Sequence, residues 1–440
     1  MFKVHRLCLY VLGVSSLFLL SDKILAAYWS IFIMLGIFLL FLKKAISSIE
    51  KLFSPMSIIV IFNNLYTIMG IYMWAYREAN FYNWDGDFWF VLRCFTIIDF
   101  FLTSFGLFVL SRCQMKNLPL NKSSMKLNRV FFLMLMLSEY VGIYLFTAGF
   151  KIIPMLSSDV DDARFELGGM ARPGAGIGML LVNLGVLCVI HLYFSKMSKI
   201  LKALLFFVIY IPFLLYGGRF LMIMPILLLM IIILIQKVDQ IRWANIVKYG
   251  IGVGFAFFLL MYYGAYRKNG SDMETEFLLD FITGDLFPEF RGAIGSYSLN
   301  KKDLSIDFFY FLMANFIPGF VATPLGIDKS KQLSIGSYIA DLLGFDGLFG
   351  IRISFTGELL LTNMFVLLLF WCLLITIVLK INQLYFRIEQ WNFSKMILLY
   401  IGISIGPIIP YGITHIPGTL LLMISLLIIY CLSFPKMSNK

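Results

Sequence analysis

Charge is what this sequence has little of. Only 14% of its 440 residues are Asp, Glu, Lys or Arg, whereas 60% are hydrophobic and 17% are aromatic, and the mean hydropathy is +0.88. Water-soluble chains carry roughly a quarter charged residues and bury their apolar side chains in one core. The composition therefore excludes a soluble protein and leaves little room for a separate soluble domain.

Cysteine and histidine are also scarce, with six and three residues. The sequence has no CxxC pair and no Cys/His cluster with zinc spacing, so a structural zinc site is excluded. It also has no GxxxxGK[ST] phosphate-binding loop and no GxSxG nucleophile motif. We therefore expect no metal and no cofactor.

Long apolar runs recur from one end of the chain to the other. A run of about 20 residues is needed to cross the hydrocarbon layer as a helix. The runs predict an all-α integral membrane protein with about 12 transmembrane helices, at 7–20, 24–42, 53–75, 88–110, 130–150, 175–194, 203–217, 220–235, 249–265, 359–379, 396–413 and 418–434.

The basic residues orient these helices. With both ends in the cytoplasm, the cytoplasmic segments hold 21 of the 36 Lys and Arg, against 6 in the short external loops. This is the bias that the positive-inside rule describes. It also accounts for much of the net charge of +11, so nucleic acid is not expected as a partner.

Three parts follow from this orientation. Residues 1–265 form an N-terminal transmembrane bundle of about nine helices with an external loop at 151–174, residues 266–358 form a large external loop, and residues 359–440 form the C-terminal transmembrane helices. The apolar stretch 306–323 inside the large loop contains Asn315, Pro318 and Gly319. We expect it to be a re-entrant or amphipathic helix rather than a span.

Arginine is concentrated on the predicted outer face. Seven of the 14 external basic residues are Arg, against five of the 21 on the cytoplasmic side. A guanidinium holds phosphate with two hydrogen bonds, which indicates an anionic, phosphate-bearing ligand outside. Pairing with nearby carboxylates is the alternative explanation. Arg219 follows Gly217 and Gly218 at a predicted hairpin, where it is either a headgroup anchor or a clamp on a membrane-embedded diphosphate.

The layout resembles the Wzy-type O-antigen polymerases, also called oligosaccharide repeat-unit polymerases. The resemblance rests on the number of spans, the two external segments, Gly217-Gly218-Arg219, the stretch Phe287-Pro288-Glu289-Phe290-Arg291, and Ser354-Phe355-Thr356-Gly357-Glu358 at the entry to the tenth span. It implies a GT-C-like arrangement in the bacterial inner membrane with a periplasmic active face.

The resemblance implies a glycosyl transfer. The growing chain would pass from undecaprenyl diphosphate to a sugar hydroxyl of the incoming lipid-linked unit. The partners would be undecaprenyl-diphosphate-linked oligosaccharide, membrane lipid and a chain-length regulator membrane protein. Arg219, Arg291 and Arg267 would stabilise the leaving diphosphate, while Arg164, Arg172 and Arg352 would hold the acceptor's diphosphate.

Deprotonating the acceptor hydroxyl requires a general base. The candidates are Glu358, Glu289 and His415, with Asp285 and Glu166 as further carboxylates. Glu358 is predicted to open the tenth span, where the positive helix end would favour it whatever its role. Arg93, Asp99 and Glu139 lie inside spans, and we expect them to pair between helices.

Three alternative functions stay open. The strings Asp85-Gly86-Asp87 and Asp159-Val160-Asp161 are compatible with a metal-dependent glycosyltransferase that uses polyprenyl-phosphate sugars. An O-antigen ligase is less well matched, because its late external His is followed by Asn, Ser or Gln, whereas His415 is followed by Ile416. A lipid-linked oligosaccharide flippase would favour two matching halves and short loops.

Overall fold

The computed structural model describes residues 11–76, 88–113, 120, 125–157, 175–216, 219–236, 251–252, 255, 259, 290, 292–294, 324, 354–361, 364–412 and 416–433. Apart from one isolated bridge between Leu120 and Trp391, the regular structure in these ranges is helical. The prediction of an all-α membrane protein is confirmed at that level, because eight of the helices are long and apolar enough to cross a bilayer.

The helices are named by their order in the chain. Their bounds are α2 Lys23–Ala45, α3 Ile49–Leu52, α4 Pro55–Tyr76, α5 Phe88–Arg112, α6 Arg129–Phe146, the short 3-10 helix η1 Pro154–Leu156, α8 Ala175–Phe194, α9 Lys199–Tyr216, α10 Arg219–Gln236, α17 Ser354–Leu360, α18 Met364–Arg387, α19 Phe393–Ile405, α20 Ile408–Tyr411 and α21 Ile416–Ser433. Helix α10 and helix α21 contain shorter apolar stretches, Leu221–Gln236 and Gly418–Cys431.

Three predicted spans differ from the structure, and one of them, 396–413, is divided between the separate helices α19 and α20. In the first, 7–20, the described helix covers only residues 11–16, and Asp22 then caps the start of α2 by accepting a hydrogen bond from the Leu25 N–H. In the tenth, 359–379, the chain forms two helices, α17 and α18, and Thr362 and Asn363 lie between them in the sequence. Both residue types favour helix starts over helix interiors. The predicted part boundary at 358/359 therefore falls inside α17.

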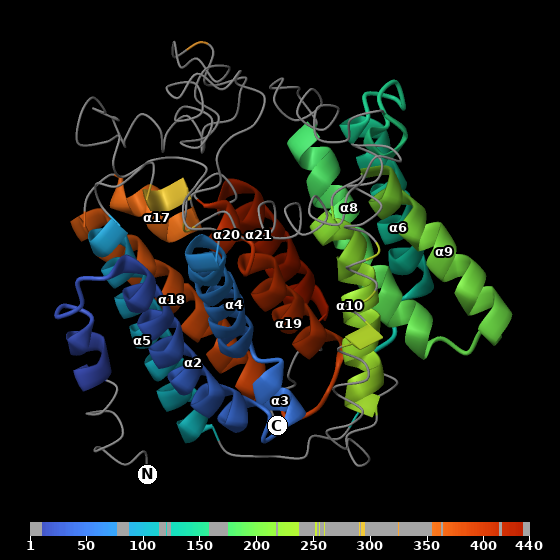
Figure 1. Ribbon diagram of the computed structural model, residues 1–440. Coiled ribbons are helices and arrows are strands. Elements are labelled where there is room, and N and C mark those ends of the chain that lie inside the picture. The colour runs from blue at the N-terminus through green and yellow to red at the C-terminus, as the bar shows by residue number, and fades with distance from the viewer. Residues whose placement is uncertain are drawn as a thin grey trace.

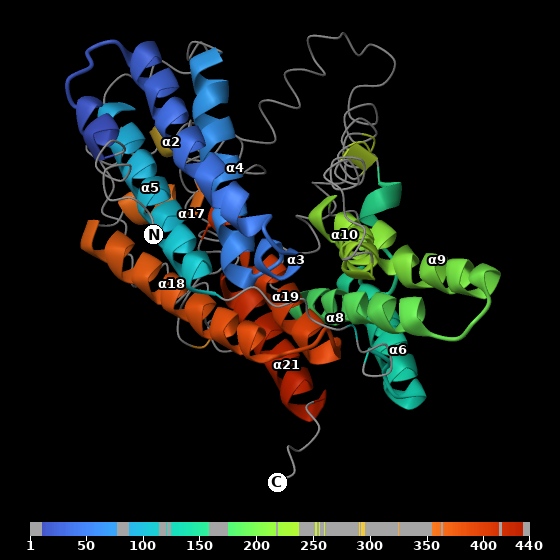
Figure 2. The same ribbon diagram turned by 90° about the horizontal axis from the view of Figure 1, so that it is seen from below.

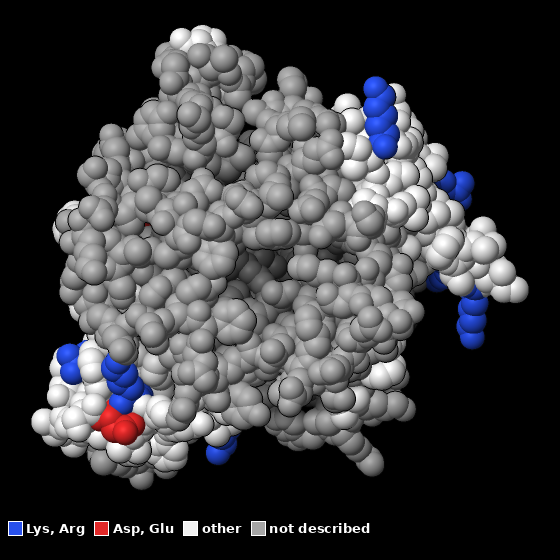
Figure 3. Space-filling view, turned by 45° about the horizontal axis from the view of Figure 1, so that its top comes forward, with Lys and Arg blue, Asp and Glu red and all other residues white. Residues whose placement is uncertain are grey.

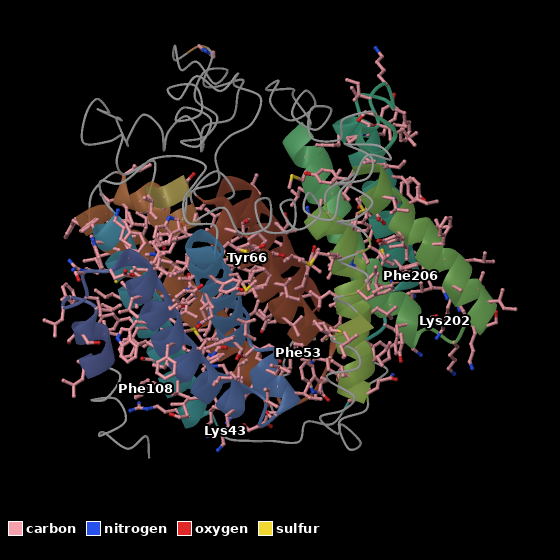
Figure 4. The ribbon with its side chains drawn as sticks, in the orientation of Figure 1. Lys43, Phe53, Tyr66, Phe108, Lys202 and Phe206 are labelled. Carbon is pink, nitrogen blue, oxygen red and sulfur yellow. The ribbon has the colours of Figure 1, made fainter. Side chains whose placement is uncertain are left out.

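The helices form two groups (Figure 1). One group contains α2, α4, α5 and α17 to α21, and the other contains α6, α8, α9 and α10, as the view from below also shows (Figure 2). Lys43 and Lys202 are both predicted to be cytoplasmic, and in Figure 4 Lys43 lies at the lower end of the molecule and Lys202 in its lower half, at the right. Helix α17 and helix α20 lie toward the opposite, upper end.

Glycines bring α6 and α8 into backbone contact. A Cβ added to Gly142 would lie 2.7 Å from the Gly178 carbonyl oxygen, and one added to Gly178 would lie 2.6 Å from the Gly142 oxygen. On the same pair, a Cβ at Gly185 would lie 2.4 Å from Cδ of Glu139. Small residues at membrane helix interfaces permit this close approach, which increases van der Waals attraction.

Among the described residues, a polar contact between Tyr400 and Asn183 joins the two groups. The buried Tyr400 on α19 donates a hydrogen bond to the backbone oxygen of Asn183 on α8, at 2.9 Å. Helix α21 also packs against α8. Helix α8 is therefore the element through which the second group is attached to the first.

A buried ion pair closes the lower end of the first group. Lys395, at the start of α19, pairs with Glu50 on α3, and its ammonium also donates to the Ile388 carbonyl at 3.0 Å. Tyr385 and Trp391 place their rings 4.5 Å and 5.2 Å from the ammonium. Because the pair is buried, removing either partner would leave an uncompensated charge.

The glycine contact yields a test of the fold. We expect Gly142→Ala and Gly178→Ala to lower the free energy of unfolding by about 1–3 kcal/mol each, because the methyl group must push the two backbones apart. The measurement is the thermal unfolding midpoint of the purified protein in detergent. Gly176→Ala is the matched control, since a Cβ there meets nothing within 4 Å; a Gly142→Ala midpoint equal to that of the control would contradict the close packing.

Candidate functional site

Glu358 lies on the short helix α17. The sequence had predicted it at the start of a long span instead. All seven residues of α17 are buried, and Glu358 is 4% exposed. The helix begins at Ser354, whose φ of 71° turns the chain sharply and whose hydroxyl accepts a hydrogen bond from the Gly357 N–H at 3.1 Å. Phe355 packs edge-on against Trp371 of α18, with 5.4 Å between the ring centroids. The carboxyl is thus carried on a fixed element.

Gly412 makes room for the Glu358 carboxyl. A Cβ added to Gly412 would lie 2.1 Å from Oε2 and 2.3 Å from Cδ of Glu358. Gly412 follows α20 with a φ of 76°, and its N–H donates to the Ile408 carbonyl at 2.9 Å. Only glycine combines this backbone conformation with this contact. The turn after α20 is therefore shaped around the carboxyl.

Phe290 fixes the middle of the predicted stretch 287–291. Its ring is fully buried and meets three aromatic rings edge-on, with centroid separations of 6.3 Å to Trp74, 6.3 Å to Phe88 and 5.4 Å to Phe95. Trp74 is near the end of α4 and Phe88 begins α5. Phe290 is thereby held at the end of the bundle where these two helices meet.

The upper end brings these elements together. Helix α17 packs against α18 and α20, and α20 packs against α4. In Figures 1 and 2 the short helical stretch 292–294, drawn in yellow, lies close to α17. In Figure 3, which tips this end toward the viewer, the visible described Lys and Arg side chains lie at the rim of the molecule.

Arg219 lies on the other helix group. It is the first residue of α10, and two residues separate it from Tyr216, the last residue of α9. This short connection is expected of a hairpin. Tyr216 fixes the end of α9, since its ring packs 4.5 Å from that of Phe146 and its hydroxyl donates to Sδ of Met179 at 3.5 Å. Figures 1 and 2 both place α10 and α17 on opposite sides of the molecule. Arg219 and Glu358 therefore belong to helices of different groups.

The other predicted site residues lie outside the described residues. These are Glu289, His415, Arg291, Arg267, Arg164, Arg172 and Arg352, together with Asp285, Glu166 and both D-x-D strings. Two of them, Glu289 and Arg291, are next to the buried Phe290 in the sequence. Among the described residues, no group of three or more His, Cys, Asp or Glu side chains is arranged to hold a metal ion.

Of the charged residues inside spans, Asp99 has the expected partner on another helix, since Asn63 donates to it. The guanidinium of Arg93 lies over the rings of Phe18 and Trp89, at 4.4 Å and 5.7 Å. The expectation of pairing is wrong for Glu139 within the described part of the chain, because neither of its buried carboxyl oxygens receives a hydrogen bond there. The residue of α8 that lies against this carboxyl is Gly185, which has no side chain that could donate a hydrogen bond to it.

Gly412 is a residue of the candidate site that the sequence did not single out. The signal for it is a single glycine at the end of an apolar run, three residues before His415. Such a glycine predicts a turn with positive φ, but its contact with Glu358 joins positions more than 50 residues apart and depends on the folded chain.

Gly412→Ala tests whether this turn holds the carboxyl. We expect the substitution to lower the free energy of unfolding by about 1–3 kcal/mol, from positive-φ strain alone, and to displace the Glu358 side chain. Gly418→Ala on α21 is the control, because a Cβ at Gly418 meets nothing within 4 Å. The thermal unfolding midpoints of the two variants in detergent decide the matter, and equal midpoints would count against the contact.

Comparison with known proteins adds no identity to these observations: no family model, no curated protein and no solved structure matches this chain.

Proposed function

We propose that this protein is a membrane glycosyltransferase of the O-antigen polymerase type. It would join undecaprenyl-diphosphate-linked oligosaccharide units on the periplasmic face of the bacterial inner membrane. The observation that carries the proposal is the Glu358 carboxyl, held against Gly412 at the upper end of an apolar helical bundle. A GT-C-like arrangement and a total of about 12 spans belong to the same proposal.

Glu358 is the proposed general base. The reaction requires an acceptor sugar hydroxyl to lose its proton as its oxygen bonds to the anomeric carbon of the donor. The bond between that carbon and the diphosphate oxygen breaks, and its electron pair leaves with the diphosphate. A carboxylate that accepts the hydroxyl proton typically contributes ~10²–10⁴-fold in rate. Glu358 suits this role because its helix and its glycine neighbour restrict where the carboxyl can lie.

Arginines are proposed to stabilise the leaving diphosphate. Negative charge develops on the diphosphate as the bond breaks, and fixed cations stabilise it without having to reorient. Arg291 is favoured among them because it follows the buried Phe290 directly. Arg219 begins a helix in the other group, so we assign it to a second part of a long lipid-linked substrate rather than to the bond that breaks.

The rival functions make different demands. A metal-dependent transferase would need a carboxylate cluster, for which the D-x-D strings are the remaining candidates, and a ligase would depend on His415. Glu358 is central to neither. A flippase would need charged groups along a path through the membrane, and Asp99 and Glu139 are the described carboxylates at that depth.

Glu358→Gln tests the base. We expect purified protein supplied with lipid-linked repeat units to lose activity by ~10²–10⁴-fold, because the amide keeps the shape of the side chain but cannot take up a proton at neutral pH. The measurement is the length distribution of glycan products in excess chelator. Glu389→Gln, an exposed carboxyl on the lower side, is the control, and the unfolding midpoint shows whether each variant is folded. Full activity of folded Glu358→Gln would pass the role to Glu289 or His415, and chelator-sensitive turnover would favour the metal-dependent enzyme.

The sidedness of the site can be tested separately. We expect an impermeant maleimide to label Lys151→Cys in intact cells and to leave Ser47→Cys unlabelled, in a background without native cysteines. Both positions are exposed in turns, and they lie on opposite predicted sides of the membrane. The reverse pattern would place α17 on the cytoplasmic side and end the proposal of a periplasmic reaction.

A further inference from the structure

Polar side chains meet at the centre of the α4–α5 pair. Thr96, Asp99 and Thr103 follow one another along α5 at spacings of three and four residues, which places them on one face, and all three are fully buried. Asn63 and Asn64 face them from α4, with 3% and 0% exposure. Helix α5 runs from residue 88 to residue 112, so this face lies near the middle of a membrane span.

Hydrogen bonds satisfy only part of this cluster. Asn63 Nδ2 donates to Asp99 Oδ1 at 2.5 Å. Asn64 Nδ2 donates to Thr103 Oγ1 at 2.7 Å and to the Val60 carbonyl at 2.9 Å. Asp99 Oδ2 and Asn64 Oδ1 are buried and receive no hydrogen bond. Two acceptor oxygens on neighbouring helices are therefore left without a donor.

Among the residues that the structure describes, no Lys, Arg or His forms an ion pair with Asp99. Helix α4 carries no charged residue, and on α2 the lysines lie at the two ends, at Lys23, Lys43 and Lys44. On α5 itself, Arg112 ends the helix, and Arg93 directs its guanidinium over Phe18 and Trp89. The ion pair that is described, between Lys395 and Glu50, is at the lower end. An ionised carboxylate in this position would be an uncompensated charge in the membrane.

We propose that the α4–α5 cluster is a sodium-binding site, with Asp99 Oδ2 and Asn64 Oδ1 as its two side-chain ligands. A carboxylate and an amide carbonyl are the oxygen ligands that hard cations prefer. The charge selects a monovalent ion, because one carboxylate balances one positive charge, whereas a divalent ion would leave a net charge in the hydrocarbon layer.

Structural polar contacts alone do not account for the cluster. Polar side chains do hold membrane helices together, and Ser30 with Thr96, whose hydroxyl oxygens are 2.5 Å apart, is such a contact between α2 and α5. That role predicts satisfied pairs. A purely structural role does not explain why the side chain is acidic, because a second Asn or Thr would suffice. It also does not explain the two unpaired acceptor oxygens, each of which costs free energy when it is buried without a donor.

The test uses the purified full-length protein in detergent, in NaCl and in N-methyl-D-glucamine chloride of equal ionic strength. Binding to the folded state stabilises it by mass action, so we expect Na⁺ to raise the unfolding midpoint by at least about 2 °C and the effect to saturate. Asp99→Asn and Asn64→Leu should abolish this rise. Asp22→Asn, an exposed helix cap on α2, should retain it.

Two results would overturn the proposal. Equal midpoints of the unmodified protein in the two salts would mean that the carboxyl holds a proton rather than Na⁺. An Na⁺ effect that persists in folded Asp99→Asn would place the bound ion elsewhere. If Asp99→Asn does not fold, equilibrium binding of radioactive Na⁺ to the unmodified protein and to Asn64→Leu decides, with one saturable site per chain expected only in the former. None of these measurements uses glycan synthesis, so they stand independently of the proposed function.

Discussion

Lipid surrounds the helices of this protein, and apolar side chains gain little by leaving lipid for one another. Specific association must then come from close backbone packing and from polar contacts that lipid cannot offer. The α6–α8 pair provides the first through Gly142 and Gly178. The Tyr400–Asn183 hydrogen bond provides the second, and attaches that pair to the rest of the molecule. The glycine contact thus fixes α6 against α8, and the hydrogen bond, together with the packing of α21 on α8, fixes the second group against the first.

The same constraint explains how a short helix can hold a candidate catalytic group. Seven residues are too few to form a stable helix alone, so α17 depends on its surroundings. Ser354 satisfies a free N–H at its start, Phe355 packs on Trp371, and Gly412 leaves space for the Glu358 carboxyl. A carboxyl placed by three separate contacts loses little further freedom when a substrate arrives.

The long helices were predictable because their signal is local. The runs at 24–42, 53–75, 88–110 and 175–194 match α2, α4, α5 and α8 within a few residues at most ends, since about 20 apolar residues suffice to define a span. The division of 359–379 into α17 and α18 was missed because only Thr362 and Asn363 interrupt an otherwise apolar run, and two polar residues leave the mean hydropathy of the run high. Hydropathy measures burial in lipid or protein, and it does not register where a helix stops.

The site was less predictable, because it depends on pairs of distant residues. The sequence singled out Glu358 as a carboxylate on the predicted outer face that could serve as a general base, and it placed the residue at the start of the tenth span, whereas the structure has it inside the short buried helix α17. Gly412 acquires its role only through contact with Glu358, and Phe290 only through Trp74, Phe88 and Phe95. None of these contacts leaves a periodic trace in the sequence.

Burial of a carboxylate does not by itself define a site, as Asp99 and Glu139 illustrate. Both are fully buried within spans. Glu139 lies against the bare backbone of Gly185, so no side-chain oxygen from that position could help to coordinate an ion. Asp99 lies among amide and hydroxyl groups from α4 and α5, and a second acceptor there is also unsatisfied. The two carboxyls thus differ in the oxygen-bearing side chains around them, and this is why ion binding is inferred for Asp99 alone.

Helix α5 also connects this cluster to the upper end, because Phe95, one turn before Asp99, holds Phe290 in place.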